Sequence, residues 1–171
     1  MVNNNGLEGV NHVKLVEAIK GGETKSDAPL NQKSNLGGSA LGLYQIVDGT
    51  RSEIYNRYYK ENMTKAEFDN LYLNDSQFQK VVASKVSEMY LPKSIEQNQN
   101  YNIPLEYAST LNYFLGPKGG DVYLKYYNSS GNNHSFAQQK YNEWYLQEYG
   151  KTNPNTNIRD YVHKAMNRYY N

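Results

Sequence analysis

The chain has 171 residues, which is enough for one hydrophobic core and short for two independent domains, so we expect a single domain spanning residues 1–171. Its 18 basic and 17 acidic residues give a net charge of +1, which disfavours nucleic acid as a partner because no long-range positive field is available. The lack of cysteine excludes disulfides and thiolate metal sites.

The first predicted helix carries apolar residues at helical spacing, Val10, Val13, Val16 and Ile19. Paired glycines then interrupt the pattern, so this helix should end just before Glu23. Residues 25–38 are polar and punctuated by proline and glycine, which indicates a loop. Residues 40–47 form a short apolar segment whose pattern fits either a strand or a helical turn.

The middle of the chain reads as a series of capped helices. Thr50 or Ser52 can cap a helix that carries Ile54 and several tyrosines. Residues 64–67 have the form of a capping box and predict a helix behind them. Asp75 can cap the next helix, whose apolar stripe runs from Phe78 to Tyr90 and stops before Pro92.

Four further helical segments are predicted in the C-terminal part. They cover residues 105–115 with Gly116 just past the end, residues 121–128, a segment from Phe136 to Gly150, and residues 158–169. Because no period-two strand or Asn-Gly hairpin is found, we expect an all-α class with room for a minor β-hairpin between residues 25 and 48.

Three segments together resemble the lytic transglycosylase branch of the lysozyme superfamily, whose members cut the MurNAc–GlcNAc bond of peptidoglycan. Residues 22–24 and 39–46 are similar to that family's Glu-Ser pair and its downstream Ala-x-Gly-Leu-Met-Gln-Ile stretch, with Thr24 and Tyr44 as departures. Residues 111–117 resemble its Ala-Tyr-Asn-Ala-Gly-Pro segment, and are closer still to the His-Phe-Leu-Gly variant of phage virion enzymes.

The third segment, residues 158–162, is similar to the family's Thr-Arg-x-Tyr-Val segment. The three segments occur in the family's order and span residues 22–162, nearly the whole chain. Phe114 departs from the pattern, because many relatives carry a substrate-binding Asn at that position. The resemblance implies a lysozyme-like fold and cleavage of the glycan strand to 1,6-anhydro ends.

Glu23 is the candidate catalytic residue. Glycoside cleavage needs an acid that protonates the leaving oxygen, and a carboxyl does so near neutral pH only where an apolar or crowded site raises its pKa. The negative end of a helix dipole favours the protonated form in the same way. A transglycosylase needs no second carboxylate, because the substrate's N-acetyl group stabilises the positive centre and the C6 hydroxyl closes onto C1.

The resemblance also assigns a set of substrate-binding residues. Gln45 is expected to be the hydrogen-bonding floor of the site, since a Gln in an apolar segment needs a partner. The remaining members of the set, which stack on the sugars, bond to them or shape the cleft, are Ser39, Gly42, Tyr44, Tyr113 and Tyr161. In a chain with 18 tyrosines, packing is an equally simple role for each Tyr.

Some alternatives remain open on the sequence. Glu17, in the first predicted helix, competes with Glu23 as the acid. Asp27 or Asp48, if placed opposite the acid, would make a hydrolytic muramidase, whose second carboxyl lies about 5–9.5 Å from the first. A non-catalytic structural or wall-binding component is the rival from another class, with Phe114 as its main support.

No metal or cofactor is predicted, because the three histidines lack paired spacing and no phosphate-binding glycine motif is present. Residues 1–10 do not read as a signal peptide, and no apolar stretch is long enough to cross a bilayer. We therefore expect a phage virion protein, or a protein delivered to the periplasm or cell wall by another route. The expected partners are peptidoglycan glycan strands, with other virion or secretion-system proteins as further candidates.

Overall fold

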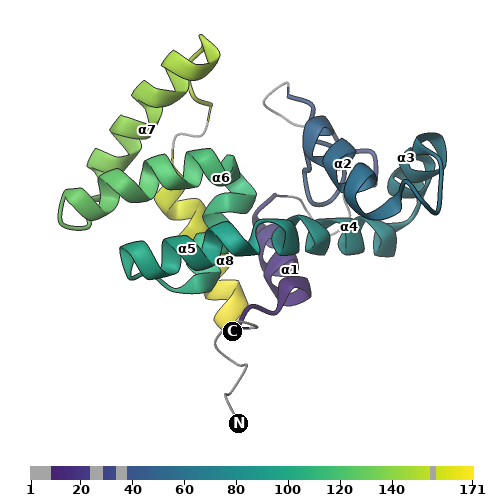
Figure 1. Ribbon diagram of the computed structural model, residues 1–171, viewed down its shortest axis with the longest axis horizontal. Coiled ribbons are helices and arrows are strands. Elements are labelled where there is room, and N and C mark those ends of the chain that lie inside the picture. Colours follow the sequence, from purple (N-terminus) through teal and green to yellow (C-terminus); the bar gives the residue numbers. More distant parts are fainter. Residues whose placement is uncertain (1–8, 24–28, 34–37, 155–156) are drawn as a thin grey trace. The chain divides into compact units, whose positions relative to one another are not determined.

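The computed structural model describes residues 9–23, 29–33, 38–154 and 157–171, with the backbone alone at residues 22 and 23 (Figure 1). Every regular element in these ranges is helical, so the all-α prediction is confirmed. The described residues divide into two compact units, one within residues 11–89 and a second made of residues 9–10 and 90–171. The single lysozyme-like domain stays a prediction.

The first unit consists of five helical elements: α1 (His12–Glu23), α2 (Asp48–Ile54), the π-helix η2 (Tyr55–Tyr59), α3 (Lys65–Asn74) and α4 (Ser76–Met89). Helix α4 is the central element, because α1, α2 and α3 all pack against it. The core of this unit is formed by apolar side chains from each of its α-helices, among them Leu15, Val16, Ile19, Ile54, Phe68, Val82 and Val86.

The apolar face of α1 differs in part from the predicted one. Val16 and Ile19 are buried as expected, whereas Val13 is 49% exposed and Leu15 takes its place in the core. Helix α1 packs against α4, and the buried side of α1 is the one that carries Leu15.

Two of the predicted caps in this unit are present and one is not. Thr64 and Glu67 form a reciprocal capping box at the start of α3. The Asp75 carboxylate accepts from the amide of Phe78 at 3.0 Å. The prediction of Thr50 or Ser52 as a cap was wrong, because α2 already begins at Asp48 and both residues lie inside it.

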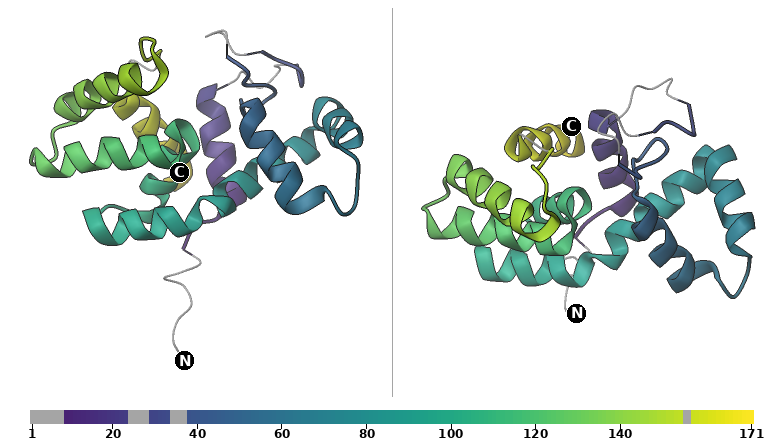
Figure 2. Two further views of the ribbon diagram at one scale, coloured as in Figure 1. Left: turned by 45° about the horizontal axis from the view of Figure 1, so that its top comes forward. Right: turned by 90° about the horizontal axis from the view of Figure 1, so that it is seen from above.

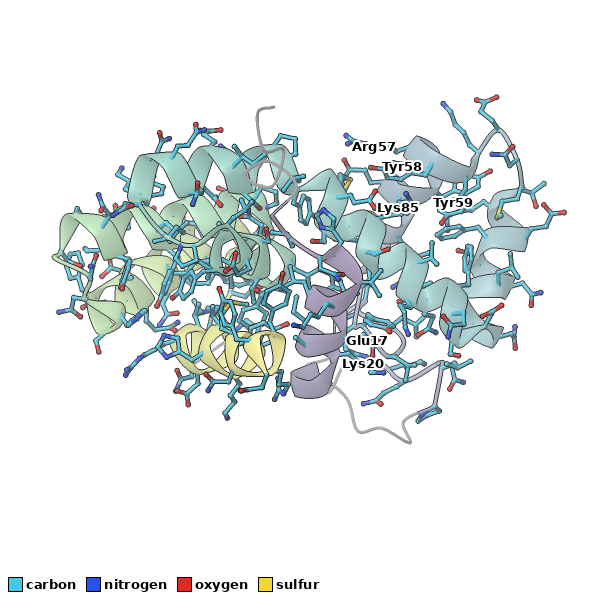
Figure 3. All side chains as sticks on the ribbon, turned by 90° about the horizontal axis from the view of Figure 1, so that it is seen from below. Glu17, Lys20, Arg57, Tyr58, Tyr59 and Lys85 are labelled. Carbon is cyan, nitrogen blue, oxygen red and sulfur yellow. The ribbon has the colours of Figure 1, made fainter. Side chains whose placement is uncertain are left out.

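A group of aromatic rings joins η2, α3 and α4. The ring centroids of Tyr59, Phe68 and Phe78 lie 5.4 Å apart in each pairing. The Lys85 ammonium on α4 lies 5.4 Å from the centroid of the Tyr58 ring (Figure 3). These edge-on and cation–π contacts fix the π-helical turn against the α4 helix.

The second unit contains α5 (Leu91–Tyr101), α6 (Leu105–Ser129), α7 (His134–Tyr149) and α8 (Ile158–Tyr170). Helix α6 packs against each of the other three, and Figure 2 shows α5 and α7 running beside it. Helix α5 was not predicted. The sequence predicts that the preceding helix stops before Pro92, but this proline occupies the first turn of α5, where a missing N–H costs nothing.

Helix α6 is interrupted at Gly116, where φ is 74° and ψ is 162°. The predicted glycine end of the 105–115 helix is thus present, and a second helical stretch starts directly at Pro117 instead of at Asp121. Gly150, with φ of 66°, ends α7 as expected. None of the described helices has both the length and the apolar character required to span a membrane.

Candidate functional site

The motif segment of residues 39–46 forms a tight turn in the first unit. The amide of Leu41 donates to the carbonyl of Ile46 at 3.2 Å, and the amide of Gly42 donates to the carbonyl of Gln32 at 2.9 Å. Isolated antiparallel bridges pair Leu41 with both Lys33 and Ile46. Among the residues described between 29 and 48 no strand forms, so the predicted minor hairpin is reduced to these bridges.

The backbone of this turn is left-handed at two positions, Gly42 with φ of 82° and Gln45 with φ of 49°. Glycine adopts such a conformation without a steric penalty, whereas a residue with a Cβ does so at a cost. The cost at Gln45 is offset by its own side chain, whose Nε2 donates to the carbonyls of Gly42 at 2.7 Å and Gln32 at 3.2 Å.

Gln79 of α4 holds the turn from inside the core. Its side chain is fully buried, and Oε1 accepts from the amide of Leu43 at 2.8 Å. Its Nε2 donates to the carbonyls of Leu30 at 2.7 Å and Tyr72 at 2.6 Å. A Cβ at Gly42 would lie 2.6 Å from Gln79 Oε1, so the glycine is required by this contact as well as by its φ.

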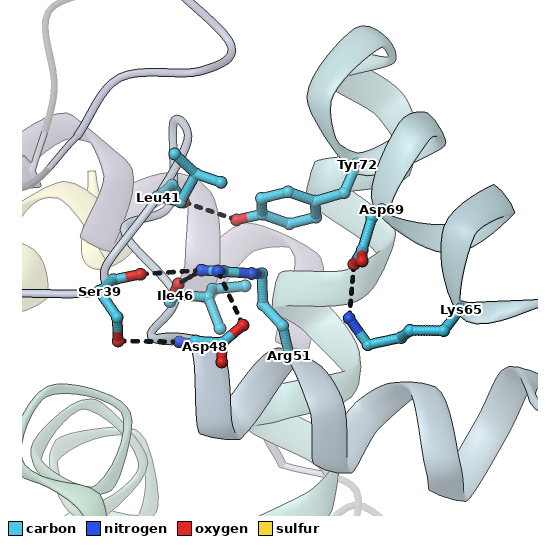
Figure 4. A network of polar contacts seen from close by, with 8 residues as sticks. All are labelled: Ser39, Leu41, Ile46, Asp48, Arg51, Lys65, Asp69 and Tyr72. Atoms are coloured by element: carbon cyan, nitrogen blue, oxygen red, sulfur yellow. Dashed lines mark hydrogen bonds and ion pairs between the residues drawn. The ribbon is translucent and has the colours of Figure 1, made fainter.

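Two more buried polar side chains bind the same turn (Figure 4). The Tyr72 hydroxyl on α3 donates to the carbonyl of Leu41 at 2.7 Å. The Arg51 guanidinium on α2 donates to the carbonyls of Ser39, at 3.1 Å, and Ile46, and it pairs with Asp48 at 3.3 Å. The turn is therefore fixed by donors or acceptors from α2, α3 and α4, and the burial of these three side chains leaves it little freedom.

Ser39 stands at the exposed start of the segment. Its Oγ accepts from the amide of Asp48 at 3.1 Å, so the hydroxyl caps the first turn of α2. Asp48, the candidate second carboxylate, is 66% exposed and engaged by Arg51. The other candidate, Asp27, lies outside the described residues.

Tyr44 is buried, with 1% of its surface exposed, and its hydroxyl donates to the Glu17 carboxylate on α1. Glu17 also pairs with Lys20 at 3.3 Å and Lys80 at 3.6 Å. Partial burial acts to raise the pKa of Glu17, but the Tyr44 hydroxyl and the two ammonium groups outweigh it and hold that pKa below its usual value. A carboxyl in this state is ionised near neutral pH and is poorly suited to donate a proton.

Glu23 is the last residue of α1. The prediction that the helix ends just before it was one residue short, because the helix continues through Gly21 and Gly22 to Glu23 itself. Glu23 thus lies at the C-terminal end of the helix. The side chain of Glu23 lies outside the described residues, so its role stays a prediction.

The remaining predicted residues lie in the second unit. Phe114 of α6 and Tyr161 of α8 stack face to face, with ring centroids 3.6 Å apart and an interplanar angle of 8°. Tyr113 is half-buried and precedes the break at Gly116 by one helical turn. The apolar ring at position 114 therefore has a definite partner, and that partner is the tyrosine that the resemblance assigns to the sugar cleft.

The histidines take part in packing. His12 Nδ1 lies 2.8 Å from the buried Ser87 Oγ, and His134 Nδ1 lies 2.8 Å from the Tyr123 hydroxyl. Burial lowers the pKa of both histidines. Within the described ranges, no three His, Asp or Glu side chains gather as a metal site would require.

The structure thus brings Ser39, Gly42, Tyr44 and Gln45 together in one turn, and places Tyr113 and Tyr161 on two packed helices of the other unit. Gln79, Tyr72 and Arg51, which fix the turn, were not identified from the sequence. Gln79 carries a sequence signal, because it is a polar residue between Phe78 and Val82 of an apolar stripe, whereas Arg51 lies among polar residues and carries none.

Comparisons of the chain with protein-family models, with curated proteins and with solved structures found no match.

Proposed function

We propose that this protein is a peptidoglycan lytic transglycosylase, with Glu23 as its single catalytic carboxyl. The proposed substrate is the glycan strand, cut at the MurNAc–GlcNAc β-1,4 bond. Three motif segments in the family's order support this proposal, together with the turn that residues 39–46 form. We further propose a virion protein that opens the wall for genome delivery, because residues 111–117 resemble a phage virion variant.

The observation that carries the proposal is the construction of the turn at residues 41–46. A chance match to the motif would not be expected to coincide with a position that requires glycine, a left-handed Gln45 and a backbone bound by three buried side chains. Strained, over-determined backbone of this kind is concentrated at functional sites. The same chain stretch leads from the end of α1, where the proposed acid stands.

The chemistry needs only the proposed acid and groups of the substrate itself. Glu23 donates a proton to the bridging oxygen as the bond from C1 of MurNAc breaks. The N-acetyl carbonyl oxygen shares the positive charge at C1. The C6 hydroxyl then attacks C1 and returns its proton to Glu23, so the enzyme is regenerated and no water is consumed.

The competing acid is disfavoured by its surroundings. Glu17 is bound by a hydroxyl and two ammonium groups that stabilise its charged form. A general acid has the opposite requirement. The choice between Glu17 and Glu23, open on the sequence, therefore falls on Glu23 in this proposal.

Mass spectrometry of the products from purified peptidoglycan tests the proposal. A transglycosylase releases muropeptides with 1,6-anhydro ends, whereas a hydrolytic muramidase releases reducing ends. Intact glycan after prolonged incubation would contradict both enzymatic assignments.

A non-catalytic wall-binding component remains the second candidate, and one specific contact favours it. Phe114 covers one face of Tyr161, so that face offers no surface to a sugar. Retention of the protein on insoluble peptidoglycan with no released product would support this second candidate.

A further inference from the structure

Glu17 lies at the centre of a polar cluster that joins three parts of the first unit. It stands in the second turn of α1 beside Lys20, with Nζ of Lys20 3.3 Å from its carboxylate (Figure 3). Lys80 of α4 approaches the same carboxylate to 3.6 Å, and Tyr44 of the turn donates its hydroxyl to it. One carboxylate therefore connects α1, α4 and the turn.

The hydrogen bond between Tyr44 and Glu17 has a fixed direction. Burial, followed by the neighbouring Glu17 carboxylate, raises the pKa of Tyr44, so the phenol keeps its proton and acts as the donor. Glu17 acts as the acceptor because its pKa is held low by that hydroxyl and the two lysines. Hydrogen bonds to a charged acceptor are stronger than neutral ones.

The position of Tyr44 affects the backbone of the residues on either side of it. The amide of Leu43, one residue before it, is bound by Gln79, and Gln45, one residue after it, is held in the left-handed conformation. Since the Tyr44 ring is buried, a shift of its hydroxyl displaces the backbone on both sides.

The other end of the connection lies close to the proposed acid. Glu17 precedes Glu23 by six residues on the same helix, which is about 9 Å along the axis at 1.5 Å per residue. The contact from Glu17 to Tyr44 therefore links the helix that ends at Glu23 to the turn that carries Gln45. The Lys20 ammonium of the same helix adds a weaker contact, 5.7 Å from the centroid of the Tyr44 ring.

We propose that Glu17 is a positioning residue: by holding the Tyr44 hydroxyl, its carboxylate fixes the Gly42–Gln45 turn relative to the end of α1. This inference rests on the proposed function, because it concerns the relative placement of Glu23 and Gln45. It assigns Glu17 no contact with substrate and no proton transfer. Misplacement of catalytic groups by about 1 Å is enough to lower turnover up to about 100-fold.

The test is a double-mutant cycle on turnover of purified peptidoglycan, with Glu17→Ala, Tyr44→Phe and the double variant. We expect each single variant to lower kcat about tenfold or more with KM unchanged, and the double variant to be no worse than the poorer single one. Glu17→Gln, whose amide oxygen still accepts from Tyr44, should recover most of the lost kcat. It also supplies a folded variant if the alanine variant does not fold.

Glu53→Ala is the matched control. Glu53 is an exposed carboxylate of the same unit, on α2, and pairs with Arg57 at 3.9 Å. Its removal should change kcat less than twofold.

Each other outcome overturns the inference in a distinguishable way. Multiplicative losses in the double variant, or a rise in KM at constant kcat, would refute positioning and leave the proposed function intact. Loss of kcat in Glu17→Gln as deep as in Glu23→Gln would make Glu17 catalytic. Wild-type protein that releases no product would refute the proposed function, and the positioning role with it.

Discussion

Replacement of Gly42 by alanine tests how the candidate turn is built. The new Cβ would lie 2.6 Å from Gln79 Oε1 and 2.9 Å from its Cδ and Nε2, and all three atoms belong to a fully buried amide. Gln79 must then move and give up contacts with Leu43, Leu30 or Tyr72.

The expected loss of stability has two parts. A left-handed φ costs an L-residue about 1–2 kcal/mol. Each buried hydrogen-bonding group left without a partner costs about 1–3 kcal/mol. With one such group lost, Gly42→Ala should destabilise the protein by about 2–5 kcal/mol, a large fraction of the roughly 5–15 kcal/mol of a typical domain.

Urea unfolding followed by circular dichroism measures this loss, and two glycines serve as controls. Gly150 has φ of 66° and open space around its Cβ position, so Gly150→Ala should cost only the backbone part. Gly49 in α2 has neither restriction, and Gly49→Ala should be neutral or slightly stabilising. Hydrogen exchange at the Leu43 amide should speed up in Gly42→Ala alone. The reasoning is refuted if Gly42→Ala costs no more than Gly150→Ala and leaves that amide protected.

Two further predictions concern stability. Tyr72→Phe removes the donor to the Leu41 carbonyl and should cost about 1 kcal/mol in urea unfolding, with faster exchange around the turn; an unchanged midpoint would mean that this bond does not hold the turn. Burial, His163 and Arg159 lower the pKa of His134, so its neutral form stabilises the folded state above the unfolded value of about 6.5, and this contribution is lost as pH falls through the lowered pKa. Between pH 7 and pH 5 the wild type should therefore lose more stability than His134→Gln, and equal losses would contradict the assignment.

The all-α class was predictable from the sequence because its signals are local. A capping box at Thr64, an Asp75 cap and the glycines at 116 and 150 act within one or two helical turns. Their effects are present in the structure as the sequence indicates. Helix α5 escaped prediction because Pro92 marks either the end of one helix or the first turn of the next, and the sequence does not distinguish the two.

Only those residues of the candidate site that belong to the motif segment could be predicted from the sequence. Ser39, Gly42, Tyr44 and Gln45 are adjacent in the chain, so their grouping follows from the segment alone. Two of the side chains that bind the turn are distant in the sequence. Gln79 binds Leu43 across 36 residues, and Tyr72 binds Leu41 across 31 residues. No periodicity encodes such a tertiary contact.

For Tyr44 the motif predicts a role but does not reveal the environment of the side chain. The motif suggests that it contacts sugar, whereas its ring is buried and its hydroxyl binds Glu17. A tyrosine pattern does not reveal whether the ring faces solvent or core, because tyrosine suits both environments. Its contact with sugar stays a prediction.

The account depends most directly on the carboxyl of Glu23, and the rate of anhydro-muropeptide release by Glu23→Gln tests it. The amide has nearly the shape of the acid but cannot donate its proton to the leaving oxygen. We predict a fall in kcat of about 100-fold or more, with peptidoglycan binding and thermal unfolding unchanged. Turnover of the folded Glu23→Gln variant at the wild-type rate would contradict the account.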